Sequence, residues 1–164
     1  MAIVVENGSV VSGANSYISL ADFKLYAAAR GITLPADATV EAYLVKSTDY
    51  LESNRNRFVG TLTERDQALS WPRNNAIIEG WAWLNTEIPR QVINCQCALT
   101  VEQVDGLDMY NPASALPVVR ENIAGAVEVE YANPGQAAKV TKTRESQAIL
   151  RTLLKNSGLM VVRA

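Results

Sequence analysis

Histidine is absent from this 164-residue chain. Its absence removes the side chain that most often acts as a general base near neutral pH, and also the commonest neutral metal ligand. Nucleophilic sites that pair serine or cysteine with histidine are therefore excluded. The glycine-rich patterns that bind nucleotide phosphates, G-x-x-x-x-G-K-[ST] and G-x-G-x-x-G, do not occur either. We expect a protein that is not an enzyme and that needs no cofactor and no metal ion.

Cysteine is scarce. The two cysteines, Cys95 and Cys97, are two positions apart within a helical pattern, so their side chains diverge by about 200° around the helix axis. They do not form a C-x-x-C pair, and two thiols without further clustered ligands do not make a structural zinc site. We expect both to be small buried apolar residues in a reducing compartment.

Long apolar runs are also missing. No stretch approaches the ~18 residues that a membrane-spanning helix needs, so no membrane partner is expected. With 48% hydrophobic residues the chain can nevertheless bury a proper core. Its length is that of one domain.

The small net charge of −2 conceals an uneven distribution. Between Glu79 and Glu130 eight acidic residues stand against two arginines, whereas from Lys139 to the end six basic residues stand against Glu145. A basic end of this kind can contact nucleic acid, but it can equally contact an acidic patch on another copy of the same chain or remain solvated.

Apolar periodicity predicts a mainly α fold, a helical bundle of about four helices with a long ordered loop and a small β arm or hairpin. The expected helices cover about 19–31, 39–54, 89–104 and 143–157, and the third is apolar on much of its surface and so central. Asn7-Gly8 is a strong two-residue hairpin signal. Within one domain we expect an N-terminal hairpin and helical core at 1–110, an extended loop with a β-strand arm at 111–140, and a C-terminal helix and tail at 141–164 that pack on the core or on a neighbour.

Periodicity fails between about 54 and 89, which predicts an ordered loop with little regular structure. A loop this long inside a compact domain needs internal anchors. The apolar candidates are Phe58, Leu62, Leu69, Trp71, Trp81 and Trp83. Trp71-Pro72-Arg73 combines a large ring, a rigid residue and a guanidinium, so Phe58 and this tripeptide are the expected anchor.

Strict alternation marks residues 126–131 as a half-buried strand. Val127, Val129 and Tyr131 share one face, and Glu128 and Glu130 share the other. Because a single strand is not stable alone, it needs a partner strand from this chain or from another copy.

The same loop offers a second interpretation. Proteins that bind single-stranded nucleic acid pair stacking aromatic rings with a basic groove. Both types interleave here within nineteen residues, at Arg55, Arg57, Phe58, Arg65, Trp71 and Arg73. Against this, Glu64 and Asp66 offset the arginines and the whole chain is acidic, so packing is the favoured role of Trp71.

Several segments resemble one known family, the small tailed-phage proteins labelled DnaT-like single-stranded-DNA-binding proteins, which are similar in size and architecture to phage head–tail connector, or adaptor, proteins. The resemblance covers most of the chain from Ala14 to about Leu99, and 126–131 and 161–163 fit it more loosely. The residues that carry it are Ala14-Asn15-Ser16-Tyr17-Ile18-Ser19, Thr48-Asp49-Tyr50-Leu51, Arg57-Phe58 with Gly60, Gln67-Ala68-Leu69, Trp71-Pro72-Arg73, Ile88-Pro89 and Cys97-Ala98-Leu99.

This resemblance implies a structural adaptor of the virion neck, assembled in the host cytoplasm as a ring of about twelve copies. Its partners would be the portal protein, the next neck or tail protein, and genomic double-stranded DNA that passes through without sequence-specific binding. The subunit or portal interface would consist of the strand face Val127, Val129 and Tyr131 and the terminal residues Met160, Val161, Val162 and Arg163. The alternative is a single-stranded-DNA-binding accessory protein of replication.

Overall fold

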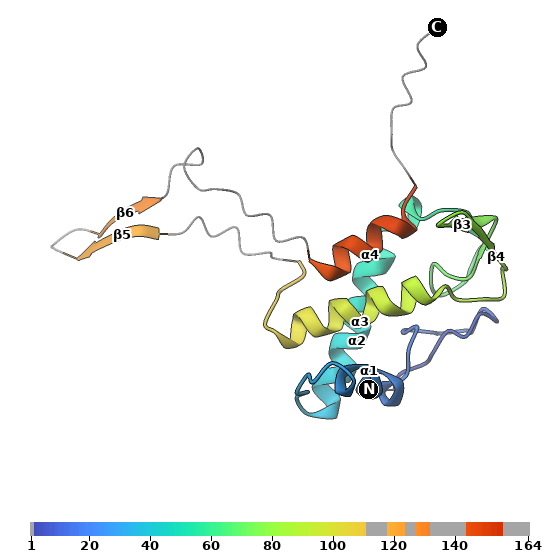
Figure 1. Ribbon diagram of the computed structural model, residues 1–164, viewed down its shortest axis with the longest axis horizontal. Coiled ribbons are helices and arrows are strands. Elements are labelled where there is room, and N and C mark those ends of the chain that lie inside the picture. The colour runs from blue at the N-terminus through green and yellow to red at the C-terminus, as the bar shows by residue number, and fades with distance from the viewer. Residues whose placement is uncertain (1, 111–117, 124–126, 132–143, 156–164) are drawn as a thin grey trace, which may run out of the picture. The chain divides into compact units, whose positions relative to one another are not determined.

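The computed structural model describes residues 2–110, 118–123, 127–131 and 144–155. Its backbone divides into two compact units, one of Met1–Leu107 with Arg144–Ala164 and one of Asp108–Thr143. The first unit contains the four helices found among the described residues (Figure 1). Among the described residues, the helices are too short or too polar to cross a lipid bilayer.

The four helices are α1 (Leu20–Ala28), α2 (Asp37–Glu52), α3 (Arg90–Val104) and α4 (Glu145–Leu153). The mainly α fold with a small β component is therefore confirmed. Ser19 begins α1 as its N-cap, where its Oγ accepts a hydrogen bond from the backbone N–H of Asp22 (3.1 Å). Helix α3 packs against each of the other three helices, as its apolar surface predicted.

The core between the first three helices is apolar and closely packed. Phe23 of α1, Val40 and Leu44 of α2, and Cys97 of α3 are fully buried and form one cluster with Ile18. Cys95 is buried as well, with its Sγ 3.4 Å from the carbonyl oxygen of Ser146 in α4. Both cysteines are free thiols, so the expected role as small buried residues is confirmed.

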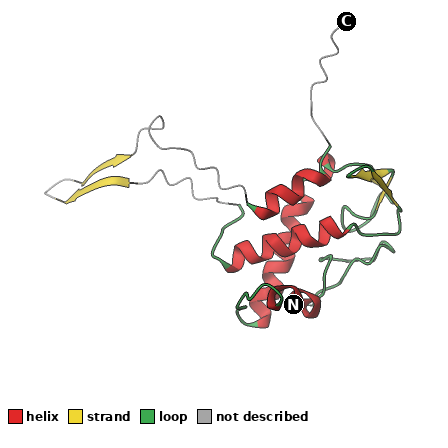
Figure 2. Cartoon of the chain, in the orientation of Figure 1, coloured by secondary structure: helices red, strands yellow, loops and turns green. Residues whose placement is uncertain are grey.

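The long loop between α2 and α3 contains more regular structure than predicted. A short 3₁₀ turn, η1 (Arg55–Arg57), is followed by four short strands: β1 (Thr61–Leu62), β2 (Arg73–Asn74), β3 (Ala76–Ile78) and β4 (Trp81–Trp83). Strand β1 pairs with β2, and β3 pairs with β4, both antiparallel. Figure 2 shows the β3–β4 pair at one end of the helical bundle. Strands of two or three residues have almost no periodicity, which is why the sequence pattern missed them.

Residues 2–16 do not form the hairpin that Asn7-Gly8 predicted. Val5 makes an isolated parallel bridge with Ser16. The backbone N–H groups of Gly8, Val10 and Val11 instead donate to the buried carboxylate of Glu6, at 2.8, 3.1 and 2.8 Å. That carboxylate takes the donors that a hairpin ladder would have used, so the chain curls around Glu6.

In the second unit, β5 (Val118–Ile123) and β6 (Val127–Tyr131) form an antiparallel ladder, in which Ile123 pairs with Val127 and Val118 with Tyr131. The strand predicted at 126–131 thus has its partner within the chain, in a segment to which the sequence assigned no strand. The expected interface on Val127, Val129 and Tyr131 stays a prediction. Ala126, Thr143, Gly158 and the terminal residues Met160, Val161, Val162 and Arg163 lie outside the described residues.

Candidate nucleic-acid interface

Trp71 lies inside the protein. Its side chain and that of Phe58 are each 1% exposed, and the two rings meet edge to face with centroids 5.9 Å apart. Pro72 is buried beside them. A ring enclosed in this way cannot stack on a nucleobase, so Trp71 packs the loop onto the helices.

Arg73 holds the same loop together from within. Although it is only 4% exposed, its guanidinium donates to three backbone carbonyls: Nε to Val59 (2.8 Å), Nη2 to Gly60 (3.1 Å) and Nη1 to Ser70 (3.3 Å). Burial, and then the nearby charge of Arg55, lower the pKa of Arg73. All three nitrogens of the guanidinium are engaged with protein carbonyls, so this arginine is not positioned for a phosphate.

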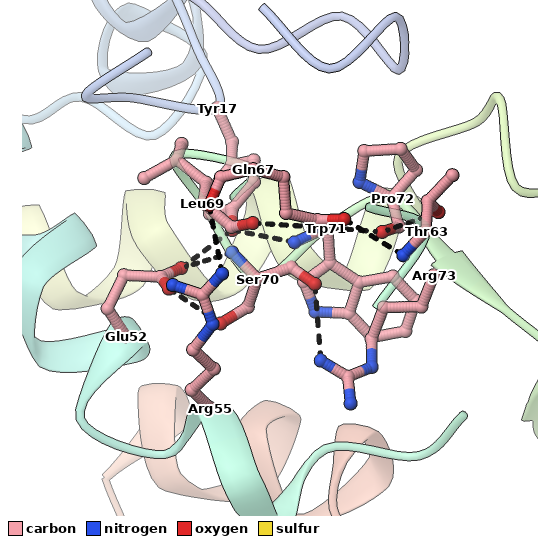
Figure 3. A network of polar contacts seen from close by, with 10 residues as sticks. All are labelled: Tyr17, Glu52, Arg55, Thr63, Gln67, Leu69, Ser70, Trp71, Pro72 and Arg73. Carbon is pink, nitrogen blue, oxygen red and sulfur yellow. Dashed lines mark hydrogen bonds and ion pairs between the residues drawn. The ribbon is translucent and has the colours of Figure 1, made fainter. Parts of the chain in front are cut away.

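Figure 3 shows a second polar residue, Gln67, within the loop. Its Oε1 accepts from the backbone N–H groups of Thr63 and Glu64, both at 2.9 Å, and its Nε2 donates to the carbonyls of Leu69 (2.7 Å) and Pro72 (3.1 Å). The buried amide therefore satisfies four backbone groups of an irregular segment, which a buried loop requires.

Glu52, in the last turn of α2, connects this loop to the N-terminal segment. Its Oε1 accepts from the hydroxyl of Tyr17 (2.8 Å) and from the backbone N–H of Ser70 (2.9 Å), and its Oε2 accepts from Ser70 Oγ (2.6 Å) (Figure 3). Burial, and then the Glu52 carboxylate, raise the pKa of Tyr17 well above its ordinary value.

Gln96 of α3 fixes the other side of the same N-terminal segment. Its Oε1 accepts from the backbone N–H of Tyr17 (2.9 Å), while its Nε2 donates to Ser16 Oγ (2.8 Å) and to the carbonyl of Leu44 (3.1 Å). The segments that carry the family resemblance, around Tyr17, Gln67 and Trp71-Pro72-Arg73, thus serve packing and hydrogen bonding within the fold.

The interleaved arginine and aromatic surface does not form as a stacking groove. Phe58, Trp71 and Arg73 are buried, whereas Arg57 and Arg65 are exposed. Arg55 is half-buried, and its Nη2 donates to the carbonyl of Gln67 (2.9 Å). The prediction failed because sequence spacing brings these residue types together but does not decide which of them the helices cover.

The exposed aromatic residue of this region is instead Trp81, whose side chain is 76% exposed. It begins β4 directly after a tight turn in which Glu79 and Gly80 both have positive φ, at 53° and 86°. Two positive φ values are the mark of a type I′ turn, the two-residue turn that best fits the twist of a hairpin. The expectation that Trp81 anchors the loop internally is therefore wrong, because this turn carries it out to the surface.

Other exposed apolar and basic residues lie at the same end of the bundle as Trp81. Ile77 of β3 and Leu84, just after β4, are also exposed, at 59% and 63%. Ile77 pairs with Ala82 in the ladder, so Ile77 and Leu84 lie on the opposite face of the hairpin from Trp81 and Trp83. Gln91 Nε2 donates to Glu79 Oε2 (3.2 Å), which places the start of α3, and with it the exposed Arg90, beside the hairpin turn.

Two further exposed cations lie at the same end of the bundle. The backbone N–H of Lys155 donates to the carbonyl of Arg57 (2.8 Å), which places these two residues side by side. Three residues after Arg57, Gly60 packs tightly on the strand leading to the hairpin, since a Cβ there would lie 2.5 Å from the Asn74 carbonyl oxygen. Within the described part of the chain, Arg57, Arg90 and Lys155 form no ion pair.

No cluster of cysteine, aspartate and glutamate among residues 2–110, 118–123, 127–131 and 144–155 is arranged to hold a metal ion. The fold and the exposed hairpin thus define a small helical protein with an aromatic, partly basic surface at one end. The chain belongs to the family described as "Putative DnaT-like ssDNA binding protein", whose model matches residues 1–164. No curated protein and no solved structure matched it.

This membership corrects the expected role. The family description names single-stranded DNA, which was the alternative, and not a connector between a phage head and tail, so the adaptor function is wrong for this chain. The partners expected with that role, and the location in the virion neck, stay untested predictions.

Proposed function

We propose that this protein binds single-stranded DNA through Trp81 of the β3–β4 hairpin, with Arg57, Arg90 and Lys155 at the same end of the bundle. The single observation that carries the proposal is the 76% exposed indole of Trp81 on a tight two-residue turn. Support comes from the family description, which names this ligand. The role is binding without catalysis, in keeping with a chain that has no histidine.

The chemistry of single strands fits this surface. An unpaired base exposes its π-face, and stacking on an aromatic side chain contributes about 1–3 kcal/mol per base. A turn with restricted backbone angles holds Trp81 outward before the ligand arrives, so little conformational entropy is lost on binding. Bases inside a duplex are already stacked on one another, so the surface favours single strands.

The acidic net charge does not oppose binding, because phosphates respond to the charges close to them. Salt screens interactions beyond roughly 10 Å, so carboxylates elsewhere on the molecule matter little at ordinary ionic strength. Three exposed cations at one end of the bundle are enough for a short strand. Each phosphate contact contributes about −0.7 to the slope of log K against log salt, so we expect a slope of about −2.

The test is fluorescence anisotropy of the full chain with labelled oligothymidylate at several salt concentrations. We expect Trp81→Ala to weaken binding by roughly 5- to 150-fold, the loss of one stacked base. Trp81→Tyr should retain most of the affinity, because the aromatic face remains.

The matched control is Leu25→Ala, which truncates another strongly exposed apolar side chain (70% exposed), on α1. It should leave the affinity unchanged. Equal affinities of the wild type and Trp81→Ala, or a wild type that binds duplex DNA as tightly as the single strand, would overturn the proposal.

A further inference from the structure

A cavity of about 500 Å³ lies on the bundle side of the hairpin. It opens between the N-terminal loop and the segment that joins β4 to α3. Its walls are largely apolar and aromatic, and two carboxylates lie among its polar groups. The lining residues are Val5, Glu6, Asn7, Tyr17, Trp83, Thr86, Glu87, Ile88 and Ile93.

The charged side chains that line this cavity are both carboxylates. Glu6 is held rigidly by its three backbone donors and is 2% exposed, while Glu87 is exposed at the rim. No lysine or arginine lines the cavity. It therefore suits a flat apolar group whose edge carries N–H donors, and it repels a phosphate.

The cavity is connected to Trp81 through the strand itself. Trp83 lies two residues further along β4, and residues two apart point to the same face of a strand, about 7 Å from each other. A single strand stacked on Trp81 therefore carries the neighbouring base to the wall formed by Trp83. Successive bases on successive aromatic rings are the usual arrangement in proteins that bind single strands.

We infer that this cavity is a subsite for one nucleobase bearing an exocyclic amine, with cytosine as the committed case, and that it gives the protein a base preference. The inference rests on the proposed function. The base lies against Trp83, and its amine donates to the carboxylate of Glu87. Carboxylates are the side chains that accept from the amine of cytosine. The phosphates stay outside, because both carboxylates repel them.

The experiment compares oligodeoxycytidylate with oligodeoxyuridylate, since the two bases differ mainly in one amine against one carbonyl. We expect the wild type to bind the cytidylate about tenfold more tightly. Glu87→Gln should bring this ratio close to one, because an amide also presents donors. Glu64→Gln, which removes the same charge from an exposed turn outside the cavity, should keep it.

A second readout follows the indole N–H of Trp83, which is buried and has no hydrogen-bond partner among the described residues. Its NMR signal, assigned with Trp83→Phe, should shift more with the cytidylate than with the uridylate. If both oligonucleotides bind equally and Trp81→Ala weakens both, the cavity is not a base subsite and the proposed function stands. If neither binds, both inferences fail.

Discussion

Replacing Arg73 by lysine tests whether the Trp71-Pro72-Arg73 segment is structural. The guanidinium donates to three backbone carbonyls through three separate nitrogens. A lysine at the same position has a single ammonium group on a flexible side chain, so we expect it to keep one of these three hydrogen bonds. Each hydrogen bond to a charged group contributes about 1.5–3 kcal/mol. Allowing for partial rearrangement of the loop, we expect Arg73→Lys to lower the free energy of unfolding by about 3 kcal/mol. That is a large fraction of the roughly 5–15 kcal/mol that stabilises a typical domain.

Urea unfolding followed by tryptophan fluorescence measures this change, and an unchanged slope would show that the loss is one of native stability. Arg57→Lys is the matched control, since Arg57 is exposed and its Nη1 makes one hydrogen bond, to Asn54 Oδ1 (3.1 Å). It should cost less than about 0.5 kcal/mol. If the free energy of unfolding of Arg73→Lys lies within about 0.5 kcal/mol of the wild-type value, the structural role of Arg73 is refuted. That result would return Arg73 to the list of candidate phosphate ligands.

Two further predictions concern the core and the close backbone contact behind the hairpin. Gly60→Ala should destabilise more than Gly31→Ala in the same urea assay, because both have positive φ (73° and 66°) but a Cβ at Gly60 would meet backbone atoms, whereas at Gly31 it would meet nothing within 4 Å; equal losses would show that the loop yields. Burial raises the pKa of both Cys95 and Cys97 to about 12 from an ordinary 9.0, so the native state holds these protons more tightly than the unfolded chain. Their contribution to stability should therefore be complete below about pH 9 and be lost as the pH rises towards 12, and the double variant Cys95→Ala, Cys97→Ala should lose less stability over that window.

The helices were predictable because their signals are local and repeated. Val40, Leu44, Ser47 and Leu51 recur at helical spacing and are buried together, and Ser19 caps its helix as the sequence indicated. The hairpins were not predictable, because each depends on one competing contact. Glu6 takes the N–H groups that Asn7-Gly8 would have placed in a ladder, while Glu79-Gly80, a poorer turn sequence, forms the real type I′ turn. Gln91 holds Glu79 from a distant helix, which no local pattern reveals.

The exposure of each tryptophan separates the two interpretations of the loop, an internal anchor and a platform on which nucleobases stack. Trp71 and Trp81 lie ten positions apart in one irregular loop, yet one is 1% and the other 76% exposed. Both are tryptophans in the same loop, so the difference in exposure arises from tertiary contacts. Phe58 packs against Trp71, and the Glu79-Gly80 turn exposes Trp81.

The segments that carry the family resemblance and the proposed binding site are different parts of the fold. The segments that carry the family resemblance are fixed by packing. Gln67 and Arg73 each satisfy several backbone groups, and the hydroxyl of Tyr17 accepts from the backbone N–H of Trp71. Trp81 is under no such constraint, because it is exposed and contributes little to the core. Substitutions there can change affinity or base preference without unfolding the protein. A binding surface of this kind can vary while the fold that supports it is kept.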